Sequence, residues 1–571
     1  MLSFACTHRI AILVALLVGS ITVAPSIIAP LSLGSAYQGV QFLPIDDEEV
    51  YRARIHEITD GYPRASSPYF LEYKNADSPM ATINDWVYAL PAFVLGLSAV
   101  IVMSKFLFPA LLFLLVYLLV RRIIGEQSGD AILAAVLGGL LVVLGYDLID
   151  YRTVLEVLSG TAIPSFPVWT RLVNPIVGAL LFFGFLHALW SMVERKKYAY
   201  VGTGILIALS VGYFFNFALA LAITGSLFLV AFLQKNYTLA RECAYAIGIS
   251  VVLDAWYWYS TLTAIGGEAG KKLALLNGMF FTHDPVINML VLATTLFFLG
   301  SIFLAWKQGV LGERRFAWGF MVALLFGSWV AFNHQIITGR TIWYYHFVQY
   351  VIPLCLVVGI LVLHSVWRPL APWLWRISMV LLAVFVLGYG VYGVLQVKNH
   401  LPAYERLQNY ATVFEYLADD KECVVMILDD NEVLERLIPA YTDCNTYTST
   451  YVYFGVPQER ILHNYLFTMK IKGISPKEVR AYIDARPDLV RSYFFSDWDQ
   501  MFGRDDGTWF ADTVAYIEDE YTQFEKGNMD EQFTKYQLDH IISKQQLSTS
   551  VLDMLPTTVV EKKGEFFFYS F

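Results

Sequence analysis

The sequence predicts a mainly α-helical, polytopic membrane protein with about eleven transmembrane helices, followed by an extracytoplasmic C-terminal α/β domain. Apolar residues make up 57% of the 571 residues and charged residues only 16%, whereas soluble proteins carry about 25% charged residues. Residues 401–571 hold 29 acidic and 16 basic side chains, a net charge of −13, and the rest of the chain has a net charge of +4. Two regions of different chemistry therefore share one chain.

The membrane part is predicted from long apolar runs. A run of about 18–20 apolar residues can cross roughly 30 Å of hydrocarbon as a helix. Residues 86–103 form a further apolar stretch, which we expect to lie along the membrane interface rather than to cross. The expected spans are 10–33, 104–121, 129–147, 173–193, 198–214, 216–234, 240–258, 286–306, 316–333, 344–366 and 376–396.

The orientation follows from the basic residues, because cytoplasmic loops are enriched in Lys and Arg. If 86–103 does not cross, all the basic clusters fall on one side of the membrane. We therefore expect a protein of the plasma (inner) membrane whose N-terminus lies in the cytoplasm. The clusters lie at 121–122, 195–197, 235–241, 314–315 and 368–376. The outward segments are then 34–103, 148–172, 259–285, 334–343 and 397–571.

We therefore divide the chain into a membrane domain at 1–398, with a large first external loop at 34–103, and a soluble domain at 399–571. In the second part short strand patterns alternate with helical ones, which is typical of a βαβ-type α/β domain. We expect strands at 423–428, 446–453, 489–495 and 539–543, a terminal hairpin at 557–561 and 565–569, and helices at 431–441, 457–470 and 476–485.

Two features of this domain bear on its chemistry. It has no glycine-rich phosphate loop, so nucleotide binding has no support, and we expect no nucleic-acid partner. Cys423 and Cys444 open neighbouring predicted strands. A disulfide between them is plausible outside the cytoplasm, and two unpaired thiols are an equally good alternative.

The most informative segment is the acidic run at 46–49, directly after the first span. Four consecutive carboxylates repel one another and raise one another's pKa values. One interpretation is a helix start, in which Asp46 or Asp47 is the N-cap and Glu48 pairs with Arg52 one turn later. The other interpretation is a catalytic carboxylate at the membrane surface.

The residues that follow resemble a known family. The run Asp47-Glu48-x-x-Tyr51, then a helix, Gly61-Tyr-Pro and an apolar helix ending Leu95-Gly-Leu-Ser98 is similar to the first external loop of GT-C glycosyltransferases. That superfamily, which uses polyprenyl-linked donors, includes protein O-mannosyltransferases, the aminoarabinose transferase of lipid A and the oligosaccharyltransferase catalytic subunit. The layout of spans and external domain is similar too.

The resemblance implies transfer of a hexose or pentose from a polyprenyl-phosphate donor to a lipid, glycan or protein acceptor at the external face. The spacing in aminoarabinose transferases favours Asp47 as the acid, and the oligosaccharyltransferase pattern favours Asp46. Glu48 and Tyr51 are then candidate substrate-binding residues. Such a transfer needs a carboxylate for the acceptor's proton and cations for the leaving phosphate.

Two outward segments offer groups for the donor phosphate. Arg171 lies beside Asn174-Pro175, and Arg340 ends a short polar turn that also contains His334 and Gln335, with His346 following. We take Arg171, Arg340 and His346 as candidate phosphate ligands and His334 and Gln335 as candidate substrate-binding residues. The alternatives are a snorkelling interface arginine and a polar turn between two spans.

Asp147 and Asp150, near the outer end of the third expected span, are candidate ligands for Mg²⁺ or Mn²⁺, because both ions prefer carboxylate oxygens. The alternative is a helix end with a local pair between Asp150 and Arg152. Asp254 is a further acidic candidate, since ionisable groups within spans are usually functional.

Two other functions are compatible with the layout. A transporter or lipid flippase is disfavoured because internal repeats and matching broken spans are not evident and about 170 residues follow the last span. A non-catalytic surface-assembly protein needs far fewer than eleven spans as an anchor.

Overall fold

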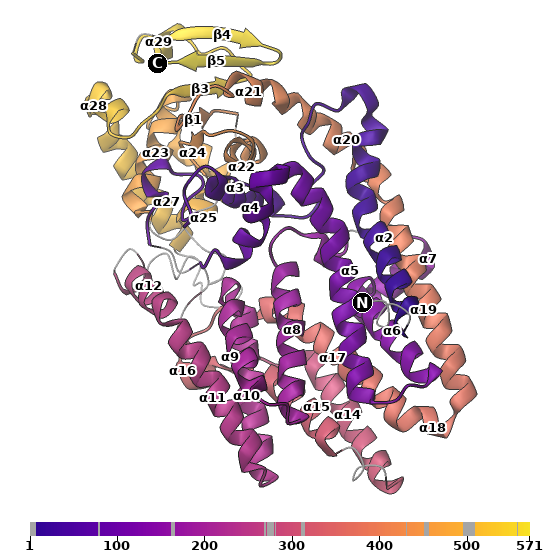
Figure 1. The fold of residues 1–571 in the computed structure, drawn as a ribbon. Coiled ribbons are helices and arrows are strands. Elements are labelled where there is room, and N and C mark those ends of the chain that lie inside the picture. Colours follow the sequence, from indigo (N-terminus) through magenta and orange to yellow (C-terminus); the bar gives the residue numbers. More distant parts are fainter. Residues whose placement is uncertain are drawn as a thin grey trace.

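The computed structural model describes residues 7–77, 80–161, 166–267, 270, 279, 281–309, 315–429, 431–449, 456–494, 509–556 and 558–571. It is mainly helical, with one five-stranded sheet near the C-terminus. In Figure 1 the long helices form a bundle below, and the sheet lies at the far end of the molecule. The loop between the first two long helices lies between these two parts.

Seven helical segments within the described residues are long and apolar enough to cross a membrane. They match seven of the expected spans, whereas a count of about eleven is not confirmed. The seven are Arg9–Ala36, Leu97–Ile124, Ile176–Val193, Phe214–Leu233, Met289–Lys307, Tyr344–Leu370 and Pro372–Tyr416.

The bundle is built from α2 to α19 and packs around one large apolar cluster. Its helices are α2 (Arg9–Leu33), α5 (Leu97–Ile124), α6 (Gly129–Val143), α7 (Tyr151–Ser159), α8 (Ile176–Val193), α9 (Ala199–Leu209), α10 (Phe214–Leu233), α11 (Tyr237–Leu253), α12 (Ala255–Gly266), α14 (Met289–Lys307), α15 (Arg315–Phe332), α16 (Gln335–Thr338), α17 (Val348–Val362), α18 (Arg368–Leu370) and α19 (Pro372–Leu395).

Two predicted apolar helices are interrupted. The stretch 86–103 is divided at Gly96, whose φ of 78° ends α4 (Ile83–Leu95) before α5 begins. Glycine takes such a positive φ without steric cost. The expected span 240–258 is likewise divided at Asp254, between α11 and α12.

Three of the basic clusters expected in the cytoplasm lie together at one end of the bundle. Arg122 Nε donates to Glu194 at 2.9 Å, Arg368 binds Glu126 at 2.8 Å, and Arg376 binds Asp130 at 2.6 Å. Three of the predicted clusters therefore share one side. Residue 314, in the predicted cluster at 314–315, lies outside the described residues.

The C-terminal part contains a βαβ unit, as predicted. Strand β1 (Val424–Ile427) is parallel to both β2 (Asn445–Thr446) and β3 (His540–Ser543), and helix α22 (Glu432–Tyr441) connects β1 with β2. The sheet order is β2-β1-β3-β5-β4, completed by the antiparallel pair β4 (Val559–Lys563) and β5 (Phe566–Ser570). The predicted hairpin and the strands at 423–428 and 539–543 are thus confirmed.

The remaining helices surround this sheet. They are α20 (Val397–Leu407), α21 (Ala411–Tyr416), α23 (Gln458–Ile471), α24 (Val479–Asp484), α25 (Pro487–Phe494), α27 (Trp509–Phe524), α28 (Met529–Thr534) and α29 (Thr549–Leu552). The predicted strand at 489–495 is wrong, because 487–494 is the helix α25. Its Val490 and Tyr493 lie three residues apart, and both enter one apolar cluster, as neighbours on a helix face do. The predicted strand at 446–453 pairs only at 445–446 within the described residues.

The first external loop and the C-terminal part are packed into a single body. Tyr69 and Phe70 of the loop belong to the same buried cluster as residues of α23 and α27. Helix α3 (Glu48–Thr59) lies against α22 (Figure 1), where Glu49 pairs with Arg436 at 3.1 Å. The two segments are therefore in direct contact.

Candidate functional site

The four side chains of the acidic run at 46–49 lie in different surroundings. Asp46 is exposed, Asp47 pairs with Arg171, Glu48 pairs with Lys105 at 2.8 Å, and Glu49 pairs with Arg436. Three carboxylates thus have one cation each, which offsets the repulsion expected from the sequence. The run begins α3, where acidic groups also interact favourably with the helix N-terminus.

The helix start differs in detail from the simple interpretation. Asp47 is the N-cap residue, but its backbone is left-handed (φ 68°) and its side chain makes no capping hydrogen bond. The expected pair of Glu48 with Arg52 is replaced by the buried pair with Lys105, and Arg52 donates instead to the Ala440 carbonyl at 2.9 Å. Burial raises the pKa of Glu48, and the Lys105 ammonium opposes that rise.

The centre of the site is the ion pair of Asp47 and Arg171, which joins positions 124 residues apart at 2.5 Å. The Asp47 side chain is 35% exposed and that of Arg171 15%. The Arg171 guanidinium also lies over the Tyr51 ring, 5.3 Å from its centroid, and its buried Nε has no hydrogen-bond partner. The arginine therefore keeps donor capacity beyond the aspartate.

The segment that carries Arg171 is held rigidly. The preceding turn Val168–Thr170 includes Trp169, whose ring is buried and donates to the Val142 carbonyl at 2.6 Å. On the other side, Asn174 accepts a hydrogen bond from the Asn84 amide at 2.7 Å. These contacts place the guanidinium at the end of α8 that faces α3.

Near the ion pair lies a group of aromatic side chains, Tyr213, Phe215 and His346. The Tyr213 hydroxyl hydrogen-bonds with His346 Nδ1 at 2.7 Å, and the His346 ring stacks on Phe215 with centroids 4.8 Å apart. Tyr213 and His346 both lie within electrostatic range of Arg171 and Asp47. The candidate His346 is therefore brought to the site, together with Tyr213, which the sequence analysis did not identify.

The other candidates belong to the polar turn, where the His334 ring packs edge-on against Phe347, the residue after His346, with centroids 6.1 Å apart. Gln335 is buried and donates to the Asp284 carbonyl at 2.9 Å, and His334 Nδ1 lies 3.3 Å from the Thr338 hydroxyl. Burial lowers the pKa of His334. Arg340 is exposed and its backbone forms a bridge with Phe281. These contacts organise the turn itself.

The two aspartates proposed for a metal have different partners. Asp150 caps α7 and binds the Arg152 guanidinium at 2.6 Å, while Asp147 accepts a hydrogen bond from the Tyr389 hydroxyl at 3.5 Å. A metal at this pair would have to displace Arg152. The donor set therefore does not fit a ready Mg²⁺ or Mn²⁺ site, and the alternative of a local Asp–Arg pair is the one observed.

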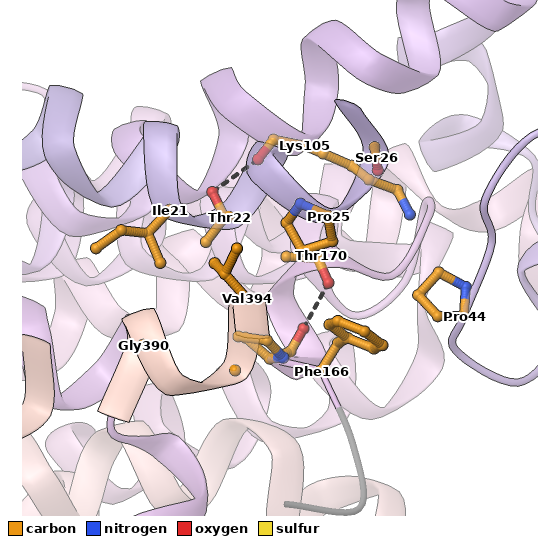
Figure 2. Close-up of a pocket in the computed structure, with 12 residues that line it drawn as sticks. Ile21, Thr22, Pro25, Ser26, Pro44, Lys105, Phe166, Thr170, Gly390 and Val394 are labelled. Carbon is orange, nitrogen blue, oxygen red and sulfur yellow. Dashed lines mark hydrogen bonds between the residues drawn. The ribbon is translucent and has the colours of Figure 1, made fainter. Parts of the chain in front are cut away.

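A narrow pocket opens beside the acidic run (Figure 2). Its walls come from α2, α5 and α19 and from the segment at 166–170. Lys105, Ser26 and Thr170 supply polar atoms, whereas Phe166 and Val394 supply apolar ones. Because Lys105 pairs with Glu48 and Thr170 precedes Arg171, the polar lining adjoins the ion pair through neighbouring residues.

The C-terminal cysteines form a disulfide. Cys423 and Cys444 are joined with their Cα atoms 4.5 Å apart. The bridge ties β1 to the segment after α22, the helix that packs on α3. Of the two alternatives left by the sequence, the structure shows the disulfide.

No family model matches the chain, and no curated protein matches it either. Among solved structures, the chain is similar to three structures of the oligosaccharyltransferase of Archaeoglobus fulgidus. The enzyme tethered to an acceptor peptide is 14% identical at a TM-score of 0.41, over 77% of this chain and 64% of that one. The present chain thus spans less than two thirds of that protein.

The second structure, archaeal oligosaccharyltransferase AglB with an inhibitory peptide and a dolichol-phosphate, is 12% identical at a TM-score of 0.45, over 94% of this chain and 69% of that one. The third, a complex with Zn and sulfate, is 12% identical at a TM-score of 0.44, over 93% and 67%. Similarity at this level assigns no residue, so the site stands on its own geometry.

Proposed function

We propose that the chain is a membrane glycosyltransferase of the GT-C type that moves a sugar from a polyprenyl-phosphate donor to an acceptor at the external face. The observation that carries the proposal is the ion pair of Asp47 and Arg171. It places a partly exposed carboxylate beside an arginine whose Nε has no hydrogen-bond partner, and it involves one of the two acids to which the sequence resemblance points.

The chemistry uses both members of the pair. The acceptor atom attacks the anomeric carbon, the bond from that carbon to the phosphate oxygen breaks, and the acceptor's proton passes to Asp47. The negative charge that develops on the leaving phosphate is stabilised by Arg171, whose fork matches phosphate oxygens. Of the two candidate acids, Asp47 is favoured over Asp46 because it is the one beside this arginine.

Without a bound donor, Asp47 forms an ion pair with Arg171, the residue that we assign to the donor phosphate. A donor phosphate would compete with Asp47 for Arg171 and so release the carboxylate toward the acceptor. Tyr51, beneath the guanidinium, would keep it in place during this exchange. The Asp47 carboxylate would thus become available as a base only when a donor is bound.

The neighbouring groups have supporting roles in this proposal. The pair of Glu48 and Lys105 fixes the start of α3, and His346 with Tyr213 forms a wall for the donor phosphate or sugar. His334 and Gln335 hold the polar turn together, and the exposed Arg340 is the member of this turn that we propose for substrate binding.

Two observations support the compartment that we propose. The disulfide of Cys423 and Cys444 belongs to an oxidising compartment, and three of the basic clusters gather at one end of the bundle, as cytoplasmic residues do. We therefore assign the site to the external face of the plasma membrane, with the N-terminus in the cytoplasm.

The proposal is tested with purified full-length protein in lipid nanodiscs. Short-chain polyprenyl-phosphate mannose, glucose and aminoarabinose are offered with membrane extract as acceptor, and release of polyprenyl phosphate is measured. Wild type should release it from one donor and Asp47→Asn should not, while Asp46→Asn retains activity. Equal release by the wild type and Asp47→Asn would contradict the assignment.

A further inference from the structure

A cluster of metal-ligating side chains lies at the far end of α3 from Asp47. His56 and Asp60 come from the last turns of α3 and its C-cap, and Asp443 comes from the segment after α22. One ligand atom from each side chain lies within 4.8 Å of the other two. Imidazole nitrogen with carboxylate oxygens is a donor set that suits zinc-class ions.

The histidine is oriented by a group outside the cluster. His56 Nδ1 lies 3.1 Å from the Pro439 carbonyl oxygen, to which it donates when protonated. That bond leaves Nε2 with the free lone pair, and Nε2 lies 3.9 Å from Asp443 Oδ1. Metal-binding histidines are commonly held in this way, with the second ring nitrogen bonded to a backbone carbonyl.

The backbone under Asp443 is fixed as well. Its carbonyl accepts a hydrogen bond from the Glu422 amide at 3.2 Å, and the next residue, Cys444, is held by the disulfide to Cys423. Asp60, in turn, follows α3 directly and lies 3.5 Å from His56 Nδ1. The ligands therefore come from two segments that are already held against each other.

The cluster is accessible to an ion from solution. The side chains of His56, Asp60 and Asp443 are 22%, 26% and 41% exposed. His56 also lines an open groove with Arg52, Thr59 and Tyr441 between α3, α4 and α22. Lys74 and Lys421 lie within electrostatic range of Asp60, and the structure gives neither an ion pair with it.

A second cluster of similar composition serves as a contrast. Asp420, Cys423 and His540 also bring ligand atoms together. There the sulfur is part of the disulfide, and His540 binds Asp420 through Nε2 at 3.0 Å and the Ser570 hydroxyl through Nδ1 at 2.9 Å. All three groups are thus engaged, and this cluster offers no open nitrogen or thiolate to a metal.

We propose that His56, Asp60 and Asp443 form a binding site for a divalent metal ion of the zinc class. The ion joins the C-terminal end of α3 to the segment that follows α22. Since α3 begins at the candidate catalytic residue Asp47, the metal braces the helix that carries it. The site is independent of the proposed transferase activity, and neither depends on the other for its test.

The experiment measures Zn²⁺ binding to chelator-stripped full-length protein in detergent, by elemental analysis and by competition with a chromogenic zinc chelator. Wild type should bind one Zn²⁺ more tightly than His56→Gln and Asp443→Asn, by about tenfold or more. His56→Cys, which supplies a thiolate ligand, should recover binding. Asp420→Asn and Asp47→Asn should bind as wild type does.

A thermal unfolding series distinguishes lost binding from misfolding. Zn²⁺ should raise the Tm of wild type and of His56→Cys, because an ion that binds only the folded state stabilises it, and it should leave the Tm of His56→Gln unchanged. Equal zinc affinity in wild type, His56→Gln and Asp443→Asn would overturn the proposal, as would a wild type that binds no zinc.

Discussion

Helix α3 takes part in two arginine–aspartate pairs that differ in almost everything except their chemistry. Arg54 binds Asp85 through two hydrogen bonds of 3.1 and 2.9 Å, and both side chains are only 3% exposed. Seven residues earlier, Asp47 binds Arg171 through one nitrogen, and its side chain is 35% exposed. The first pair is closed to other ligands, and the second can open for one.

This difference is the basis on which we propose a structural role for the first ion pair and a functional role for the second. Arg54 uses its third nitrogen on the Ala65 carbonyl at 3.3 Å, so its donors point into the protein. Arg171 has a buried Nε without a hydrogen-bond partner. A closed pair contributes to the fold, because breaking it leaves a buried charge, whereas an open pair with unused donors can exchange its carboxylate for a phosphate.

The largest expected effect is the loss of transfer in Asp47→Asn. Without a carboxylate to take the acceptor's proton, the rate should fall by about 10²–10⁴-fold. Because this side chain is partly exposed, the Tm should change little. Donor turnover and thermal unfolding are measured on the same variant. A loss of stability together with the loss of activity would indicate that Asp47 has a structural role.

The closed pair should behave in the opposite way. Asp85→Ala leaves the Arg54 guanidinium buried without its partner, which costs about 3–5 kcal/mol of stability. The exposed pair of Arg64 with Asp77, at 3.3 Å and about 60% exposure, provides the control. Asp77→Ala should cost about 1 kcal/mol or less. Similar Tm values for the two variants in detergent would remove the distinction between closed and open pairs.

A conservative change sharpens the role of the arginine. Arg171→Lys keeps the positive charge but loses the planar fork that binds phosphate through two nitrogens. We expect the KM for the donor to rise by about 10–100-fold, the range of one or two hydrogen bonds to a charged group. The value of kcat should fall less. Steady-state kinetics at varied donor concentration measure the two separately, and a fall in kcat alone would contradict a phosphate-binding role.

The smallest effect concerns a third acid of the same helix. Glu57 is 3% exposed, and burial raises its pKa from 4.5 to about 8. The folded state therefore holds a proton that the unfolded chain releases, so the contribution of Glu57 to stability is most favourable below about pH 4.5 and becomes less favourable as the pH rises to about 8.

Replacing this acid should remove that dependence. Glu57→Gln needs no proton, so it should exceed the wild type by about 1–3 kcal/mol at pH 7–8 and equal it near pH 4.5. Thermal unfolding across this range measures the difference, with the exposed Glu415→Gln as the control. Parallel pH curves for wild type and Glu57→Gln would show that the proton is held elsewhere.

Local patterns predicted much of the architecture. Apolar length predicted the seven long helices, and alternation with turn residues predicted β1, β3 and the terminal hairpin. The run at 489–495 was predicted as a strand because its apolar and aromatic residues are of the types common in strands. Pro487, at the first position of α25, is a signal for a helix start, because proline is common at that position.

The site was only partly predictable, for a physical reason. Asp47, Tyr51 and Arg171 were chosen for their charge, position and family resemblance, but their contact spans 124 residues and depends on how α3 packs on the bundle. The partner of Glu48 was missed because Lys105 lies at the start of an expected span. Tyr213 was missed because an aromatic residue at a span end is ordinarily an interface anchor.

The most direct test of the open pair is equilibrium binding of a short-chain polyprenyl phosphate, without a sugar, to purified wild type, Asp47→Asn and Arg171→Ala. If Asp47 competes with the phosphate for Arg171, Asp47→Asn should bind as tightly as wild type or more tightly. Arg171→Ala should bind about tenfold more weakly or worse. Equal binding by wild type and Arg171→Ala, or equal weakening in both variants, would contradict the account.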